Sequence, residues 1–109
     1  MTDDIVDVLT QVANEINDRT GKRIAEVKVN DRTGDVALIT QRSASEVDVD
    51  EDEVRVLIWL PIPAIAPALR VVKDKEGIKV VAFDKVYKVN ASRFIVTEAK
   101  NTAFVFLFK

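Results

Sequence analysis

Residues 47–63, VDVDEDEVRVLIWLPIP, decide how the fold is read, because acids crowd their first half and prolines interrupt their apolar second half. Val47 and Val49 alternate with acids, as on a half-exposed strand. The alternation resumes on the opposite parity at Val54, Val56, Ile58 and Leu60. A one-residue slip turns over a whole strand face. We therefore expect residues 50–53 to contain a turn or a bulge that resets the register.

The spacing of Asp48, Asp50 and Asp52 is the spacing that begins a calcium-binding loop. The rest of the loop pattern fails, since the sixth position holds Glu53 in place of Gly and the twelfth holds Trp59 in place of Glu. A solvated acidic turn is expected here. No metal or other cofactor is expected in the chain.

Residues 56–69 carry no charge, but they are too few to cross a bilayer. Three prolines interrupt them, and we expect Pro61 to end a strand while Pro63 and Pro67 keep the following connection extended. The apolar loop PIPAIAP, residues 61–67, is then expected to pack over a sheet edge or to contact a partner.

An amphipathic helix is predicted over residues 3–20, with Thr2 or Asp3 as its N-terminal cap and Gly21 as its C-terminal cap. Its apolar residues recur at helical spacing and form one stripe: Ile5, Val8, Leu9, Val12, Ala13 and Ile16. We expect this stripe to pack on a sheet or on a partner helix.

Beyond the helix the apolar period changes to two, which predicts strands. Gly34 supplies the positive φ of a tight hairpin turn, and residues 74–77 predict a second turn of the same design. The alternative for the second region is a short helix over residues 67–76. Four β-branched residues beside the second turn favour the hairpin: Val71, Val72, Val80 and Val81.

The chain closes with a third hairpin, which is predicted to turn around residues 98–102. The last strand alternates Ala103, Val105 and Leu107 with Phe104, Phe106 and Phe108, so both of its faces are apolar. We therefore expect it to be covered on both faces, with a partner subunit as one candidate cover.

The 109 residues are predicted to form a mainly β protein with one N-terminal helix and seven or eight short antiparallel strands. The regular turn signals favour a sandwich or a barrel. The alternative is an α+β arrangement in which the helix packs on one face of a single antiparallel sheet.

Cysteine and histidine are both absent, which excludes disulfides, thiolate metal sites and the Ser-His and Cys-His nucleophilic pairs. No catalytic constellation is present in the sequence, so we expect a protein that is not an enzyme. The N-terminus lacks the basic and apolar regions of a secretory signal, so a cytoplasmic location and no membrane association are expected.

Charge is unevenly placed, because residues 1–54 hold 14 acids and 6 bases, a net of −8, and residues 55–109 hold 4 acids and 10 bases, a net of +6. The simpler interpretation is that the two halves complement each other within the fold or across an oligomer. The alternative is a weak nucleic-acid binder with Tyr87 and Trp59 as stacking residues. Its basic residues would be Arg70, Lys73, Lys75, Lys79, Lys85, Lys88, Arg93 and Lys100.

The order of segments in the second half resembles the α-crystallin domain of small heat-shock proteins and their CS-like relatives. The acidic turn at residues 50–53, the apolar strand 54–60 and Pro61 resemble the family's acidic turn and Leu-Pro-Gly strand end. The segment FIVTEAKNTAFVFLFK, residues 94–109, stands where the family has Ile-x-Ala, a turn and Asn-Gly before the last strand.

The sequence departs from this family at two motif positions and at two features used in assembly. Ile62 stands in place of the Gly after Leu-Pro, and Thr102 in place of the Gly after Asn. Only Asp84 and Lys85 separate two strands where bacterial members have a long loop, and no Ile-x-Ile tail is present. Loop exchange and tail-mediated assembly are therefore not expected.

The resemblance implies an immunoglobulin-like β-sandwich over residues 46–109, with residues 1–45 as a helix and β-hairpin extension and both parts in one compact unit. It also implies a chaperone or co-chaperone of the stress response, homo-oligomeric, that binds apolar segments of client proteins or partner subunits. A structural subunit of a larger cellular or viral assembly is the alternative. The candidate partner-binding residues are Leu69, Val71, Phe94, Ile95, Val96, Ile62, Ile65, Phe104 and Phe106.

Overall fold

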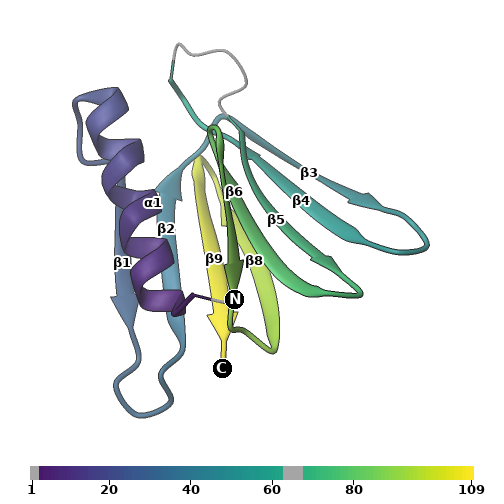
Figure 1. Ribbon diagram of the computed structural model, residues 1–109. Helices are drawn as coiled ribbons and strands as arrows, with labels where there is room; N and C mark the ends of the chain where they lie inside the picture. Colours follow the sequence, from purple (N-terminus) through teal and green to yellow (C-terminus); the bar gives the residue numbers. More distant parts are fainter. Residues whose placement is uncertain (1–2, 63–67) are drawn as a thin grey trace.

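One helix lies against two packed antiparallel sheets in the computed structural model, which describes residues 3–62 and 68–109 (Figure 1). The first sheet has the strand order β1-β2-β9-β8, and the second has the order β3-β4-β5-β6-β7. The elements are α1 (Ile5–Thr20), β1 (Ala25–Val29), β2 (Val36–Gln41), β3 (Ala44–Val49), β4 (Val54–Trp59), β5 (Ala68–Asp74), β6 (Gly77–Ala82), β7 (Lys85–Val89), β8 (Arg93–Ala99) and β9 (Thr102–Phe108). The prediction of a mainly β protein with one helix and antiparallel strands is confirmed. The single-sheet alternative is wrong, because the strands divide into two sheets.

The ends of α1 follow from its capping residues. The side chain of Asp4 accepts a hydrogen bond of 2.8 Å from the N–H of Val6, so Asp4 is the N-terminal cap and not Asp3. Thr2, the other expected cap, lies outside the described residues. Gly21 has a φ of 67° and its N–H donates to the carbonyl of Asn17, which confirms the predicted C-terminal cap.

The segment before α1 is fixed to β7, the edge strand of the second sheet. The N–H of Asp3 donates to the carbonyl of Lys88 at 2.8 Å, and the N–H of Asn90 donates to the carbonyl of Asp3 at 3.0 Å. Asp3 therefore forms a parallel bridge to β7 and satisfies part of that exposed sheet edge.

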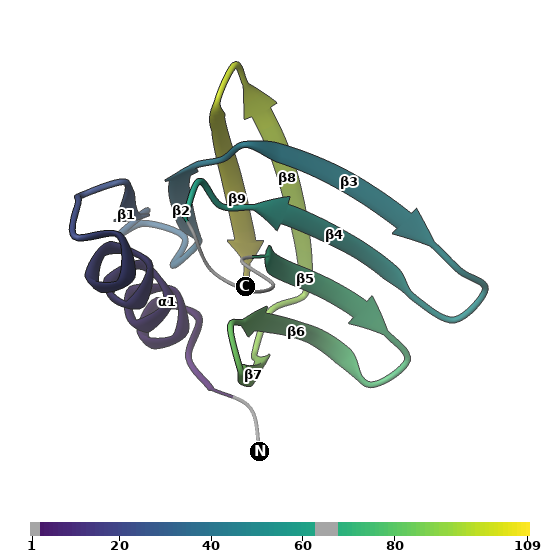
Figure 2. The same ribbon diagram turned by 90° about the horizontal axis from the view of Figure 1, so that it is seen from above.

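The predicted apolar stripe of α1 is buried against β1, β2 and β7 (Figure 2). The amide of Asn17 fixes the end of the helix to β1. Its oxygen accepts hydrogen bonds from the N–H groups of Ile24 and Ala25, both at 2.9 Å, and its nitrogen donates to the carbonyl of Ala25 at 2.9 Å. Tertiary packing therefore supplies most of the helix stability, as is usual for an amphipathic helix.

The core lies between the two sheets and under α1. Strands β2, β4, β5, β6 and β9 contribute alternate residues to it, and the largest fully buried side chains of the strands are Leu38, Ile58, Leu69, Leu107, Val36, Val71 and Val80. Aliphatic residues at alternate positions on both inner faces give the ~10 Å layer that packed sheets require.

The hairpin turns lie where the sequence predicts them. The N–H of Asp50 donates to the carbonyl of Glu53 at 2.8 Å, and Val47 faces Val56 across the β3–β4 pair, so a turn resets the register as expected. Gly34 has a φ of 79°, and Asp74 faces Gly77 at the end of a hairpin, which excludes the alternative helix for the described residues 68–76.

The N-terminal third shares a sheet with the C-terminal hairpin, because β2 pairs with β9 from Val36 opposite Leu107 to Gln41 opposite Thr102. The boundary expected between residues 45 and 46 falls inside β3. Residues of the expected extension therefore form half of the four-stranded sheet.

Replacing Leu38, which is fully buried on β2, by Ala is expected to lower the free energy of unfolding by about 2–5 kcal/mol, because it leaves a cavity between the sheets. The measurement is urea unfolding at equilibrium. Val86 is the matched control, since its side chain is 63% exposed, and Val86→Ala should change the free energy by less than about 0.5 kcal/mol. Equal losses in the two variants would contradict the assignment of Leu38 to the core.

Candidate interaction surfaces

Three of the expected partner-binding side chains belong to the core. Leu69 and Val71 on β5 are buried between the sheets, and Ile62, just after β4, is buried as well. The sequence could not show this, because β5 carries apolar residues at adjacent positions and either parity could face inward. A partner cannot reach these three side chains in this fold. Ile65 lies outside the described residues.

The expected contacts on β8 divide between its two faces. Phe94 and Val96 point toward the second sheet and are half-buried against the core. Ile95 points to the opposite side and is 39% exposed. β8 is also an edge strand, so its backbone groups on one side have no neighbouring strand among the described residues.

The outer face of the four-stranded sheet carries an apolar surface, which we call the phenylalanine face: Ala37, Ile39, Ile95, Phe104, Phe106 and Phe108. The rings of Phe104 and Phe106 stack with their centroids 6.5 Å apart, and those of Phe106 and Phe108 are also 6.5 Å apart. No described element packs on this face, so within the described chain β9 is covered on one face, and cover of its other face by a partner subunit stays a prediction.

One end of the phenylalanine face is closed by charged groups. The guanidinium of Arg93 lies 4.2 Å from the centroid of the Phe108 ring, which is a cation–π contact. Asp35 accepts a hydrogen bond of 3.0 Å from the N–H of Lys109. That bond lowers the pKa of Asp35 below its ordinary value, with smaller contributions from the Thr33 hydroxyl and from the charge of Arg93.

A second apolar surface lies on the inner side of the β3–β4 hairpin, and we call it the valine overhang: Val47, Val49 and Val54. Val47 is 65% exposed and Val49 is 69% exposed. Val47 and Val49 point to the same face of the sheet as the buried residues Val56 and Ile58. They are nevertheless exposed, because the hairpin projects beyond the strands of the first sheet (Figures 1 and 2). Among the described residues, no second layer therefore lies beneath the apolar side of the hairpin tip.

The acidic turn at the end of this hairpin is paired with nearby bases. Lys75 lies 3.4 Å from the carboxylate of Asp52, and Arg55 lies 3.7 Å from that of Glu53 and 3.9 Å from that of Asp48. No group of three or more acidic residues among residues 3–62 and 68–109 has the arrangement of a metal site. The turn is solvated and carries exposed ion pairs, which contribute little stability.

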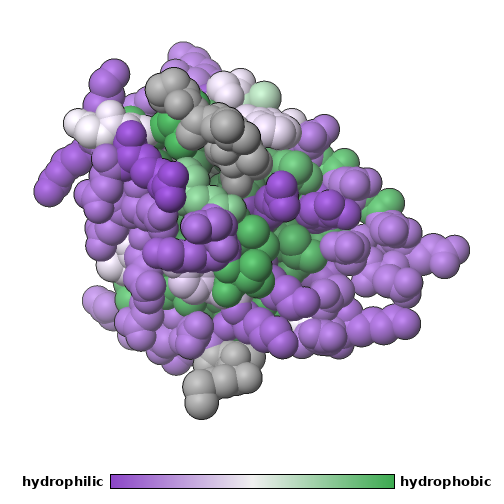
Figure 3. Space-filling view, turned by 45° about the horizontal axis from the view of Figure 1, so that its top comes forward, coloured by the Kyte–Doolittle hydropathy of each residue, from purple (hydrophilic) through white to green (hydrophobic). Residues whose placement is uncertain are grey.

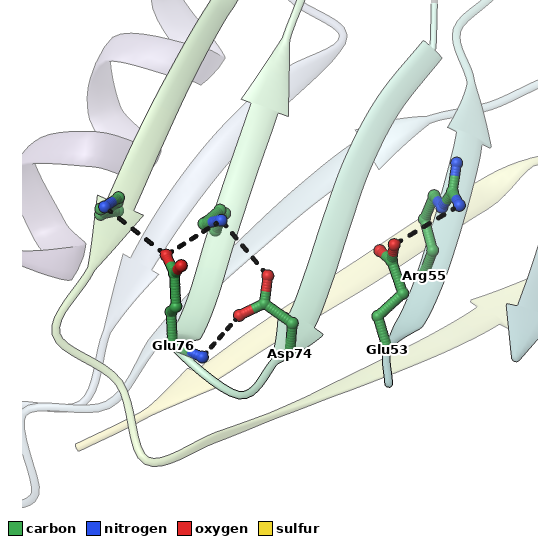
Figure 4. Close-up of polar contacts among 6 residues, drawn as sticks. Glu53, Arg55, Asp74 and Glu76 are labelled. Carbon is green, nitrogen blue, oxygen red and sulfur yellow. Dashed lines mark hydrogen bonds and ion pairs between the residues drawn. The ribbon is translucent and has the colours of Figure 1, made fainter. Parts of the chain in front are cut away.

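Four of the eight basic residues considered for nucleic-acid binding form ion pairs with described acids: Lys75, Lys79, Lys85 and Lys88. Lys79 lies 3.2 Å from the carboxylate of Asp74 and 3.6 Å from that of Glu76, which Lys88 approaches to 3.8 Å (Figure 4). The hydrogen bond that Lys79 donates to the Asp74 carboxylate raises the pKa of Lys79, and the N–H of Glu76, which donates to Asp74, lowers the pKa of Asp74. These pairs disfavour nucleic acid as a ligand, since the acids would repel phosphates.

The outer face of the five-stranded sheet alternates apolar and charged residues. Arg70 lies between Leu57 and Val81 in one cross-strand row, and Val72 lies between Arg55 and Lys79 in the next. Figure 3, which looks onto this side, shows apolar surface broken by hydrophilic side chains.

A groove of about 550 Å³ lies between α1 and β1, and its lining includes Asn14, Asn17, Arg23 and Glu26. The Asn17 amide at this groove is already bonded to backbone, and the buried unpartnered side-chain atoms of the described residues, those of Arg42, Ser45 and Arg55, do not line it.

Sequence reasoning missed the valine overhang and part of the phenylalanine face. Val47 and Val49 carry only the signal of a half-exposed strand, and nothing in the sequence shows that the facing layer ends before them. Ala37 and Ile39 join the phenylalanine face because β2 pairs with β9. The alternation of residues 36–39 identifies the strand but not its partner.

A comparison with known protein families, curated proteins and solved structures finds no match to this chain. No helix in the described part of the chain has the length and hydropathy needed to cross a membrane. Function must therefore be argued from the two uncovered apolar surfaces.

We expect the pKa of Asp35 in the folded protein to lie below 3.8, because the N–H of Lys109 stabilises the ionised carboxylate. Since the folded pKa is depressed, the stability from this bond is present above the pKa of the unfolded chain and is lost as pH falls through the folded pKa. Titration of the Asp35 carboxyl carbon by NMR checks the value.

Two variants test the cause of this shift. Thr33→Val removes a smaller contribution and should raise the Asp35 pKa only slightly, whereas Asp35→Asn should reduce the loss of unfolding free energy between neutral and acidic pH. An Asp35 pKa at or above 3.8 would show that the bond to Lys109 is not formed in solution.

Proposed function

We propose that this protein is a non-enzymatic interaction module that adds an extended, apolar segment of a partner protein to the free edge of β3. The observation that carries the proposal is the exposure of Val47 and Val49 on an edge strand. Exposed apolar side chains beside a free backbone edge are the two requirements of recognition by strand addition.

The backbone of β3 is oriented for such pairing. Asp50 donates its N–H to the Glu53 carbonyl, and hydrogen-bonded positions alternate along an antiparallel pair. The N–H and C=O groups of Ser45, Val47 and Val49 therefore point away from β4 toward the free edge. Three consecutive outward positions can hold a partner strand of about five residues.

The side chains of β3 define the chemistry of the bound segment. Val47 and Val49 lie on one face, so an added strand would place apolar residues beside them on that face. Glu46 and Asp48 occupy the other face, and Asp50 and Glu51 follow at the turn. A segment that alternates β-branched apolar residues with Lys or Arg would satisfy both faces.

The acidic residues also limit which chains can pair. Like charges along the edge repel a second β3 and other acidic strands, and they discourage unspecific edge-to-edge aggregation. Selection by charge together with apolar contact is typical of a module that binds one class of segment.

The sequence resemblance supports the same kind of activity. If the two packed sheets are an α-crystallin-like sandwich, the protein is a chaperone or co-chaperone that binds unfolding clients by their apolar segments, and a cytoplasmic location fits that role. The support consists of the acidic turn, the strand β4, which ends just before Leu60-Pro61, and the final hairpin.

Replacing Val47 and Val49 together by Lys should weaken binding of a synthetic peptide that alternates Val and Lys by about tenfold per valine. Burial of one valine contributes about 1.5 kcal/mol or more, and ~1.4 kcal/mol corresponds to tenfold. Fluorescence anisotropy measures the dissociation constant, and light scattering of a thermally unfolding client measures suppression of aggregation.

The matched control is Val86→Lys, which changes an equally exposed valine on the edge strand at the other side of the same sheet. This variant should bind the peptide and suppress aggregation as the unmodified protein does. Unchanged binding by the double variant, or no binding by the unmodified protein, would refute strand addition at β3.

A further inference from the structure

We infer that the phenylalanine face is the contact surface of a homodimer, in which two copies pack their four-stranded sheets face to face about a two-fold axis perpendicular to β9. This inference is independent of the proposed function, because the valine overhang and the β3 edge belong to the other sheet. It rests on the composition of the face and on the charges at its rim.

The two central rows of the phenylalanine face carry no charge on β2, β9 and β8, and Arg93 of β8 lies beside Phe108 at one end of the face. One cross-strand row consists of Ala37, Phe106 and Ile95, and the next consists of Ile39, Phe104 and Thr97. On the outer face of the five-stranded sheet, Arg70 lies in the middle of one row, and Arg55 and Lys79 flank Val72 in the next. In both sheets the side chains alternate between the inner and the outer face, yet only the four-stranded sheet has an outer face with the composition of an interface core.

The area of this face limits the strength of the dimer. Four strands about 4.8 Å apart and about six residues of ~3.3 Å rise give a flat projection of roughly 19 by 20 Å. That projection, roughly 380 Å², lies below the ~600 Å² per partner found at the lower end of specific interfaces, so the dimer is expected to be a weak one. Aromatic side chains at its centre are the residue type that contributes most to such contacts.

The charges at the rim determine the symmetry. Glu26 and Lys28 lie on the outer face of β1, opposite Ile39 and Ala37 respectively, and neither forms an ion pair with another described residue. A two-fold axis perpendicular to β9 and between these two rows exchanges the rows. It therefore places Glu26 of each copy opposite Lys28 of the other, and two ion pairs form.

The other simple axis, parallel to β9, gives a worse match. It would place Lys28 of each copy over Ile95 of the other and Glu26 over Thr97, so both charges would lose water without a partner. The perpendicular axis also stacks Phe104 of one copy on Phe106 of the other, which extends the aromatic contact already present within each chain. An isologous contact of this kind closes as a dimer and does not propagate.

Sedimentation equilibrium of the unmodified protein should give twice the chain mass of 12.2 kDa. Lys28→Glu and Glu26→Lys should each weaken dimerisation by about tenfold, because each change places like charges together at two symmetric positions. The double variant E26K/K28E should restore dimerisation, since it exchanges the two charges and leaves their opposition intact.

The central contact is tested by Phe106→Lys, which should give a monomer at concentrations where the unmodified protein is a dimer. Val72→Lys is the matched control, because Val72 is also half-buried and central on the outer face of the other sheet. Circular dichroism and thermal unfolding establish that both variants are folded under the conditions of the mass measurement.

A mass of 12.2 kDa at millimolar concentration would overturn the proposal and would leave the face to a different protein. A double variant E26K/K28E no better associated than the single variants would overturn the proposed axis. The double variant Val47→Lys, Val49→Lys distinguishes failure of the dimer proposal from failure of the proposed function. It should remain a dimer and lose peptide binding.

Discussion

The pairing of β2 with β9 is the constraint on which the rest of the structure depends. It joins Val36 to Leu107, residues that are far apart in the sequence, and it places the N-terminal helix and hairpin in the same sheet as the C-terminal hairpin. Closing so long a loop costs entropy before any contact compensates it. The compensation comes from the inner face, where Leu38 and Val105 pack with the second sheet and with α1.

The chain passes from the first sheet to the second within two residues after β2, and Arg42 fixes this crossing. Its N–H donates to the carbonyl of Asn101 at 2.8 Å, and its guanidinium contacts the carbonyl of Lys100 and the carboxylate of Glu98, both at 2.7 Å. The crossing lies at one end of the β8–β9 hairpin, so β3 passes over that hairpin and extends beyond it (Figure 2). The valine overhang is a geometric consequence of this crossing.

Much of the fold could be predicted from local sequence signals. The buried stripe of α1, its end at Gly21, the turn after Asp50 and the turn before Gly77 each depend on residues within a few positions of each other. The candidate surfaces were harder to predict, since Leu69 and Val71 resemble exposed strand residues as much as Val47 and Val49 do. Only the position of the facing layer distinguishes the two pairs, and distant residues determine that position.

The sequence by itself determined the elements, their ends and the alternation of apolar residues, because capping, turn geometry and the periods of helix and strand are local properties of the chain. The tertiary structure alone decided which apolar faces meet and which stay uncovered. Phe104 and Val105 are neighbours of similar hydrophobicity, yet Val105 is buried in the core and Phe104 lies on an open face. Their difference arises because α1 and the second sheet both pack on the same side of β9, and nothing in the described chain packs on the other.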